Sequence, residues 1–506
     1  MQTNHLFVMA SILVYLGGMI ILGAVYTRKN RSTEDFYLGG RKLGPLVTAM
    51  SAEASDMSAY LLMGLPGVAL LSGLPEAVWT SIGLAIGTYL NWRLVAKRIR
   101  GYSHRLGAVT VPDFFSRRYH DDKHLLSLVS AIIIIVFFIP YTASGFNACG
   151  TLFSSLFGVD YFPAMIISAS VIVAYTVLGG FLAASITDLV QSLIMTLALI
   201  VVVVFGIHAA GGWNAVVENA QRLPGYLSLT QGYDVSTGAA GTYSVVTIIS
   251  TLAWGLGYFG MPHILLRFMA IEDPNKLTVS RRVASVWVVI SMGMAVLIGI
   301  IGSAMSGSGG LAPIVPGDSQ RIIIKIAEKI ASYGTLPAII AGLIFAGILA
   351  ATMSTADSQL LAASSSVSEN ILHNFFKINL SKKASMLAAR LTVVAIAVIG
   401  AFIARDPNSS VFHIVSFAWA GFGASFGPVM LFALFWKRSN RNGALAGMIT
   451  GGCMVFIWKY LLRPLGGIWD IYELLPAFLC ASLAIVVVSL LTAPPEKEIV
   501  DEFESI

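Results

Sequence analysis

The chain has 506 residues, of which 56% are hydrophobic and only 11% are charged. A soluble globular domain carries about 25% charged residues, so this composition excludes one and predicts an integral membrane protein. The net charge of +6 is then expected to report membrane topology, and no nucleic-acid partner is predicted.

Apolar runs of about 20 residues, the length that crosses a bilayer as a helix, recur along the whole chain. They predict an all-α membrane protein with about thirteen transmembrane helices. The predicted spans cover residues 6–26, 44–73, 76–96, 125–153, 161–179, 184–210, 244–265, 283–305, 335–368, 388–404, 411–436, 442–462 and 473–493.

The second predicted span is interrupted at its centre by the segment SAEASDMS, residues 51–58, which contains the carboxylate of Asp56. A carboxylate at bilayer depth costs roughly 2.5–3.5 kcal/mol on insertion scales. Small polar residues around such a charge predict an unwound helix whose backbone groups line a cavity. We therefore expect a cation at this break, where it offsets the buried charge.

Basic residues gather on one side of the predicted membrane. The loops and span edges that follow the odd-numbered spans hold 25 of the 32 Lys and Arg residues, and Arg267 is counted among them. By the positive-inside rule this side is cytoplasmic. The sequence thus predicts a multi-pass protein of the cell inner (cytoplasmic) membrane, with the N-terminus outside and the C-terminus inside.

The seventh predicted span is also interrupted, because WGLGYFGMP at residues 254–262 combines three glycines with a proline. Each interrupted span opens a group of five. Since five is odd, the second group enters from the opposite side, and such inverted repeats bind their ligands at the paired breaks. The predicted organisation is an extra helix and loop (1–43), a first repeat (44–210), an extracellular loop (211–243), a second repeat (244–436), and two C-terminal helices with a cytoplasmic tail (437–506).

Sodium prefers oxygen ligands, which unwound backbone and hydroxyl side chains supply. Ser354 and Thr355 in the ninth span are candidates, although such hydroxyls also bond back to carbonyls of their own helix. Asp357 and Asp188 are further carboxylates within spans, and Asp188 lies near a span end where solvation is an alternative. Glu53 lies one helical turn before Asp56.

Aromatic side chains accompany both breaks: Tyr60 follows the first, Tyr141 lies in the fourth span, and Trp254 and Tyr258 lie at the second. Aromatic walls with a few polar anchors suit a small, partly apolar solute. Packing or anchoring at the membrane interface is the alternative for each.

Five motifs resemble the sodium/solute symporter family, most closely its bacterial sodium/proline symporters. They are SAEASDMS at 51–58, LMGLPG at 62–67, WGLGYFGMPH at 254–263, MST at 353–355, and WAGFG at 419–423 with FGP at 426–428. The resemblance runs from about the first span to the thirteenth.

The resemblance implies a sodium ion between the first broken helix and the eighth core helix. The implied ligands are the carbonyls of Ala54, Met57 and Ala351 and the hydroxyls of Ser354 and Thr355. The residues implied or expected to act in coupling or at a second cation are Glu53, Ser55, Asp56, Asp188 and Asp357. The implied solute site contains Ser58, Ala59, Tyr60, Tyr141, Trp254, Tyr258 and Pro262.

The chain departs from the proline symporters at Glu53, Ala59, Tyr60, Met261 and Asp357, where they carry Gly, Gly, Trp, Gln and Ser. Our hypothesis is that the two extra acids alter ion stoichiometry or admit protons, which uptake measured at several pH values tests.

The sequence therefore predicts a sodium-coupled symporter that imports a small amino acid, L-proline above others, by alternating access. Its partners would be Na+, the solute and the lipid bilayer. Another amino acid, a carboxylate or an osmolyte is the alternative solute, and a membrane solute sensor or a channel is the alternative class. No catalytic constellation is found, so an enzyme is not expected.

Overall fold

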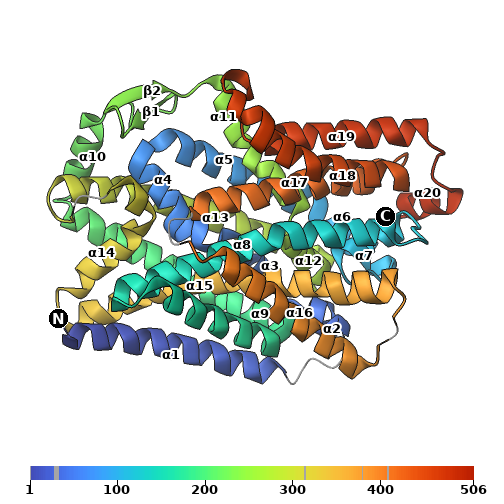
Figure 1. Ribbon diagram of the computed structural model, residues 1–506, viewed down its shortest axis with the longest axis horizontal. Coiled ribbons are helices and arrows are strands. Elements are labelled where there is room, and N and C mark those ends of the chain that lie inside the picture. The colour runs from blue at the N-terminus through green and yellow to red at the C-terminus, as the bar shows by residue number, and fades with distance from the viewer. Residues whose placement is uncertain (1, 28–32, 313–314, 379, 407–409) are drawn as a thin grey trace.

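The computed structural model describes residues 2–27, 33–312, 315–378, 380–406 and 410–506. Their regular secondary structure is helical except for one antiparallel hairpin, β1 (Gln231–Asp234) with β2 (Ala239–Thr242). Most helices run along the long axis of the molecule, and the two termini lie at opposite ends of it (Figure 1). The predicted all-α class is confirmed.

The helices have the following bounds. They are α1 (Gln2–Thr27), α2 (Thr33–Leu38), α3 (Pro45–Ala59), α4 (Leu65–Ser72), α5 (Leu74–Leu90), α6 (Ala96–Arg105), α7 (Val111–Arg118), α8 (Leu125–Phe157), α9 (Tyr161–Ala209), α10 (Trp213–Arg222), α11 (Val245–Leu252), α12 (Pro262–Ala270), α13 (Leu277–Gly307), α14 (Ile322–Ala331), α15 (Thr335–Ser365), α16 (Lys382–Ile403), α17 (Val411–Phe435), α18 (Arg441–Ile457), α19 (Leu474–Leu491) and α20 (Lys497–Glu504). Short 3-10 or π-helical segments are η1 (Gly39–Arg41), η2 (Tyr60–Gly64), η3 (Asn91–Val95), η4 (Ala253–Gly260), η5 (Pro274–Lys276), η6 (Pro316–Arg321), η7 (Ser366–Phe375), η8 (Trp458–Leu462), η9 (Arg463–Leu465) and η10 (Gly467–Trp469).

Within the described ranges, ten helices are long and apolar enough to cross a membrane, or eleven when the bent pair Val245–Gly260 and Pro262–Ala270 counts as one span. The other two of the thirteen predicted spans fall on shorter apolar helices. The predicted span 76–96 corresponds to α5, which has 17 residues before the wide turn of η3. The predicted span 161–179 is the first part of α9, before the backbone turns at Gly180.

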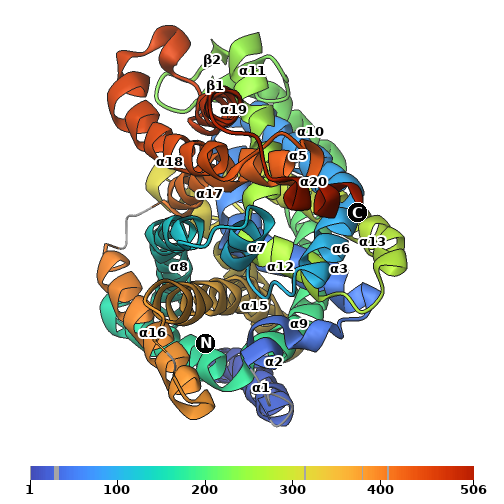
Figure 2. The ribbon, with the colours of Figure 1, turned by 90° about the vertical axis from the view of Figure 1, so that its right-hand side faces the viewer.

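The first broken helix, α3 with α4, lies at the centre of the bundle. In its most apolar window 89% of the residues are buried, against 28% in α1 and 33% in α16. Seen along the long axis, α1, α13 and α16 lie at the periphery while α12 and α15 lie inside (Figure 2). Among the ten helices that are long and apolar enough to cross a membrane, the one with the lowest mean hydropathy, 1.3, is therefore also the most buried.

The two broken helices run in opposite directions. Leu43, just before α3, pairs with Ile271, just after α12, through hydrogen bonds from Leu43 N to Ala270 O (3.1 Å) and from Glu272 N to Leu43 O (2.9 Å). The start of one broken helix thus lies beside the end of the other, as an inverted repeat requires.

Glycines let α5 approach the second broken helix until the backbones touch. A Cβ at Gly87 would collide with the backbone of Gly255, and one at Gly83 with the carbonyl of Leu252. Small residues at such contacts are the usual device for close helix packing in membranes. This contact positions η4, and therefore the second break, against the first repeat.

We expect Gly87→Ala to destabilise the protein by roughly 1–3 kcal/mol, because the added methyl group meets backbone that cannot yield. The matched control is Gly293→Ala on α13, where a Cβ meets nothing within 4 Å. That control should cost nothing and can stabilise by up to about 1 kcal/mol. Thermal unfolding of purified protein in one detergent measures both, and equal unfolding temperatures would contradict the packing described.

Candidate ion and solute site

The first helix break falls at Ser58, two residues after Asp56. Ser58 has φ 49° and ψ −168°, a conformation that an L-residue with a side chain rarely adopts, and the chain resumes as the π-helical turn η2. The hydroxyl of Ser58 accepts a hydrogen bond from the Tyr60 N–H at 3.1 Å. The side chain thereby supports a backbone that has left the regular helix.

The second break lies between η4 and α12. Met261 is extended (φ −76°, ψ 109°), and Pro262 begins α12 after a bend of 48°. A side chain at Gly257 would collide with the indole of Trp419, and one at Gly260 with the carbonyl of Phe422. Glycines here serve close approach to α17 as well as loosening the helix.

Four of the five residues predicted to bind sodium are joined by hydrogen bonds across α3 and α15. The Ser354 hydroxyl donates to the carbonyl of Ala54 at 2.8 Å and to that of Ala351 at 3.2 Å. The Thr355 hydroxyl donates to the same Ala351 carbonyl at 3.1 Å. Met57, the fifth, lies on α3 directly before Ser58 and is buried. The set consists of neutral oxygens, the ligands that an alkali cation prefers.

Asp56 links the two breaks. Its Oδ2 accepts a hydrogen bond from the Tyr258 hydroxyl at 2.5 Å, and its carbonyl accepts one from the Tyr141 hydroxyl at 3.2 Å. Two residues predicted to contact solute therefore bind this aspartate from η4 and from α8. Ser55 is buried beside it, and its hydroxyl donates to the Ala52 carbonyl of its own helix at 3.0 Å.

Glu53 is buried and points from α3 toward α5 and η3. Its Oε1 accepts hydrogen bonds from Trp92 Nε1 at 2.9 Å and from the Thr88 hydroxyl at 3.1 Å. Neither partner was identified from the sequence, where nothing distinguishes Thr88 or Trp92 from other residues of a membrane helix. Glu53 and Asp56 thus lie one turn apart and bind different neighbours.

Asp188 forms a buried ion pair that sequence reasoning missed. Its Oδ2 lies 3.2 Å from Arg267 Nη2 and accepts a hydrogen bond from the Ser51 hydroxyl at 2.6 Å. Arg267 also donates to Ser51 at 3.0 Å and to Ser358 at 2.5 Å. The charge pattern places Arg267 among the basic residues at the edge of the membrane. This placement is wrong, because its side chain is 1% exposed.

This cluster joins α3, α9, α12 and α15. It lies about one helical turn from the predicted sodium ligands, because Ser51 precedes Ala54 on α3 and Ser358 follows Ser354 on α15. Asp357 borders it, because the Ser358 hydroxyl contacts Asp357 Oδ1 at 3.1 Å and also donates to the Ser354 carbonyl at 2.8 Å. The solvated alternative for Asp188 is wrong, since the residue is fully buried.

The predicted solute residues at the breaks are buried beneath stacked rings. Tyr60 stacks on Trp254, with ring centroids 5.6 Å apart, and on Phe412 at 5.8 Å. Trp254 stacks in turn on Tyr472 at 5.1 Å. Phe412 and Tyr472 lie far along the chain from the first break. The sequence did not predict their contact with it, because neither residue belongs to one of the motifs. Ala59 and Pro262, which end α3 and begin α12, are buried too.

A cavity of about 390 Å³ lies on the other side of this aromatic layer. It is lined by residues of η2, α4, α5, η6 and α17, including Gly64, Glu76, Gln320, Phe412 and His413. Phe412 belongs to both the cavity wall and the ring stack, so the layer separates the cavity from Ser58. The cavity therefore adjoins the predicted solute residues.

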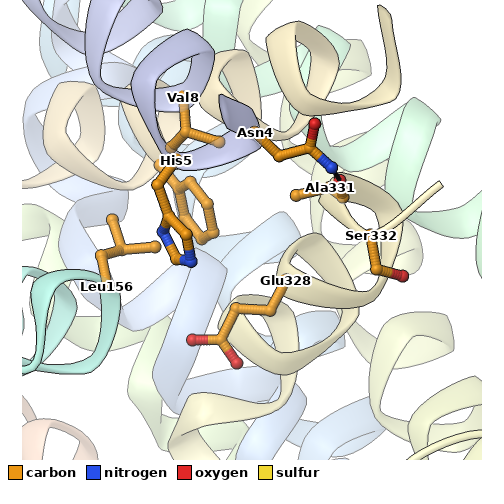
Figure 3. A pocket seen from close by; sticks show the side chains of 8 residues that line it. Asn4, His5, Val8, Leu156, Glu328, Ala331 and Ser332 are labelled. Atoms are coloured by element: carbon orange, nitrogen blue, oxygen red, sulfur yellow. Dashed lines mark hydrogen bonds between the residues drawn. The ribbon is translucent and has the colours of Figure 1, made fainter. Parts of the chain in front are cut away.

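A second cavity, of about 230 Å³, lies near the N-terminal end of α1 and is separate from the predicted ion and solute residues. His5 of α1 and Glu328 of α14 point into it, and Asn4 donates to the Ala331 carbonyl at 2.9 Å (Figure 3). The Asn4 hydrogen bond joins α1 to α14. The cavity contains none of the predicted ion or solute residues.

Two antiparallel broken helices that bring oxygens and aromatic rings together at mid-bundle define a cation-coupled secondary transporter. The model of the Sodium:solute symporter family matches residues 36–451. The chain belongs to the sodium:solute symporter family. It is a transporter and not an enzyme, a multi-pass membrane protein, and in this family sodium is a coupled substrate.

Similar proteins cover almost the whole chain. A sodium/proline symporter of Salmonella typhimurium (strain LT2) is 41% identical over 492 residues, which is 97% of this chain and 94% of that protein. The high-affinity proline transporter PutP of Bacillus subtilis (strain 168) is 41% identical over 488 residues, 96% of this chain and 98% of that protein. The osmoregulated proline transporter OpuE of the same organism is 41% identical over 491 residues, 97% and 96%.

Among solved structures, the substrate-bound outward-open state of a Na+-coupled sialic acid symporter matches with a TM-score of 0.78 at 17% identity, covering 97% of this chain and 99% of that one. Mhp1, a nucleobase-cation-symport-1 family transporter, matches with a TM-score of 0.55 at 14% identity, covering 94% and 99%. These likenesses show a shared fold.

We expect Asp188→Asn to destabilise the protein by about 3–5 kcal/mol, because it leaves the buried guanidinium of Arg267 without its counter-charge. The double variant Asp188→Asn/Arg267→Gln should lose less than the single one. Breaking the exposed pair Glu272–Lys276 (2.8 Å) with Glu272→Gln is the control and should cost less than about 1 kcal/mol. Thermal unfolding of these three variants and of the wild type measures the losses, and a double variant that is less stable than Asp188→Asn would contradict the pair.

Proposed function

We propose that this symporter carries a small amino acid, L-proline, together with sodium by alternating access. The observation that carries the proposal is the hydrogen bond from Ser354 to the Ala54 carbonyl, which brings hydroxyls of α15 to the backbone of a broken helix. Identity near 40% to proline transporters over nearly the full chain supports the solute.

The proposed sodium ligands are the carbonyls of Ala54, Met57 and Ala351 and the hydroxyls of Ser354 and Thr355. When sodium enters, the two hydroxyl protons turn away and their oxygens face the ion. The ion then replaces a single hydrogen bond with several ligands shared between α3 and α15. Sodium binding would therefore fix the first broken helix against α15.

The proposed solute site lies at the breaks, under the layer of Tyr60, Trp254 and Phe412. Ser58, Ala59, Tyr141, Tyr258 and Pro262 complete it. Because Tyr258 and Tyr141 both bind Asp56, an ordered ion site would also order the solute site, and the linkage acts equally in the reverse direction. The coupling role proposed for Glu53, Ser55, Asp56, Asp188 and Asp357 follows from their place on these contacts.

The five-plus-five inverted repeat, the division into segments and the orientation with the N-terminus outside belong to the same proposal. The antiparallel broken helices support the repeat, and termini at opposite ends of the long axis support opposite sides of the membrane (Figure 1). The cavity beside Phe412, which we propose as the entrance for solute, then lies on the outer side of the membrane. The Arg267–Asp188 pair lies toward the inner side.

Proteoliposomes holding the purified protein should accumulate labelled L-proline against its gradient when sodium is imposed outside, and not when potassium replaces it. Unlabelled proline should compete more strongly than other amino acids, carboxylates or betaine-type osmolytes. Accumulation of another solute from this panel, with proline inactive, would retain the symporter and replace the solute. Downhill flux without accumulation would contradict coupling.

Thr355→Ala and Ser354→Ala should each raise the sodium concentration for half-maximal uptake by at least about tenfold, which corresponds to about 1.4 kcal/mol of lost ion binding. The matched control is Ser365→Ala on the same helix, whose hydroxyl donates to the Ala362 carbonyl at 2.8 Å, away from both breaks. Sodium titration of proline uptake, with folded protein quantified by size-exclusion chromatography, measures the effect. Unchanged sodium activation in both variants would place the ion elsewhere.

A further inference from the structure

A third cavity, of about 390 Å³, lies at the predicted cytoplasmic end of the bundle, between η3 with α6 on one side and η5 with α13 on the other. Its lining carries three basic side chains, Arg93, Lys97 and Arg281, and no acidic one. Within the described part of the chain none of the three forms an ion pair. The nearby acid Glu272 is paired with Lys276 at 2.8 Å, and Asp273 caps the Asn275 N–H at 2.9 Å.

The uncompensated charge predicts an anionic ligand. Three cations around one concave surface, with the Asn275 and Thr278 side chains in the same wall, match the oxygens of a phosphate group. Lys97 and Arg93 are exposed and Arg281 is half-buried, so the cavity is reached from the surface.

The surface around the cavity changes from basic to apolar along both helices. On α5 the exposed residues Ile82 and Ile86 precede Tyr89, which is followed by Arg93 and Lys97. Their spacing of three or four residues places them along one helix face. The guanidinium of Arg281 lies over the ring of Tyr89, 5.5 Å from its centroid, as expected of an interfacial tyrosine.

The same gradient runs along α13. Thr278 and Arg281 line the cavity, while Val286, Val289 and Ile290 are more than half exposed further into the predicted membrane. A soluble anion needs only the basic end of such a groove. A phospholipid uses both ends, because its headgroup meets the cations and its acyl chains lie on the exposed aliphatic residues.

We propose that this cavity binds the headgroup of an anionic phospholipid from the cytoplasmic leaflet. Basic pockets between transmembrane helices on the cytoplasmic side are the usual recognition sites for such lipids. The site goes beyond the proposed transport function and does not depend on the identity of the solute.

Its position gives the lipid a route to the ion site. Trp92 lines the cavity and donates its indole N–H to Glu53, which directly precedes Ala54. A bound headgroup would hold η3 against η5 and thereby restrain the residue that anchors Glu53. The lipid would thus stabilise the wall behind the first broken helix.

The test uses the full-length protein in nanodiscs of phosphatidylcholine, with or without phosphatidylglycerol, and in phosphatidylcholine with added inorganic phosphate. Phosphatidylglycerol should raise the unfolding temperature by at least about 3 °C, as expected of a ligand that binds the native state. Native mass spectrometry should show bound phosphatidylglycerol. Arg93→Gln/Lys97→Gln/Arg281→Gln should lose both effects.

The matched control, Lys123→Gln/Arg282→Gln/Lys383→Gln, removes the same charge from exposed positions outside the cavity and should retain both effects. Because a triple change can impair folding, the single variant Lys97→Gln, at an exposed side chain, should weaken phosphatidylglycerol binding about fivefold. Equal lipid effects in the cavity variants and wild type would overturn the proposal. So would equal losses in the control, and so would full stabilisation by inorganic phosphate, which would indicate a soluble anion.

Discussion

The structure depends on the requirement that a carboxylate at mid-membrane find hydrogen-bond donors. Asp56 meets it with the hydroxyl of Tyr258, while Tyr141 binds the carbonyl of the same residue. Because these donors come from η4 and α8, the side chain and the carbonyl of one residue bring three distant segments to one point. The break at Ser58 depends on the same enclosure, because backbone can leave the helix inside a membrane only where protein surrounds it.

The buried acids are compensated in two different ways. Asp188 has a full counter-charge in Arg267, so this pair is neutral as a unit. Glu53 and Asp56, in contrast, accept hydrogen bonds from the uncharged groups of Trp92, Thr88 and Tyr258. No ion pair involves either acid within the part of the chain that the structure describes. The two acids that lie beside Ala54 and Met57 thus have hydrogen-bond donors but no counter-charge, which is an environment where a bound cation would be stabilised.

The sequence could predict the features that are local. Three local patterns predicted the breaks and the hydroxyl ligands without knowledge of any contact. They are an acid among small polar residues, three glycines before a proline, and adjacent hydroxyls in an apolar run. Thr88, Trp92, Phe412 and Tyr472 could not be found, because their roles arise from neighbours far along the chain. Arg267 was misplaced for a related reason: a basic residue one turn from a polar loop looks interfacial unless its buried partner is known. The glycines of the second break predicted the interruption of the helix. They did not predict the close contact of Gly87 with Gly255, because that contact is visible only when the position of the neighbouring helix is known.

The contacts at the two ends of the broken helices differ in kind, and this difference bears on how the protein would move. Where α3 begins and α12 ends, Leu43 shares backbone hydrogen bonds with Ala270 and Glu272, and Arg41 adds a bond to the Met269 carbonyl at 2.8 Å. Backbone pairing of this kind makes the two broken helices one body. At the breaks, Tyr60 and Trp254 meet Phe412 of α17 through their rings, and the Trp419 indole N–H of α17 donates to the Trp254 carbonyl at 2.7 Å. The Tyr60–Phe412 ring contact can separate without leaving a polar group unsatisfied, whereas separating Trp254 from α17 breaks a hydrogen bond. Under the proposed alternating access, the Tyr60–Phe412 contact is therefore the part of this interface that opens at least cost.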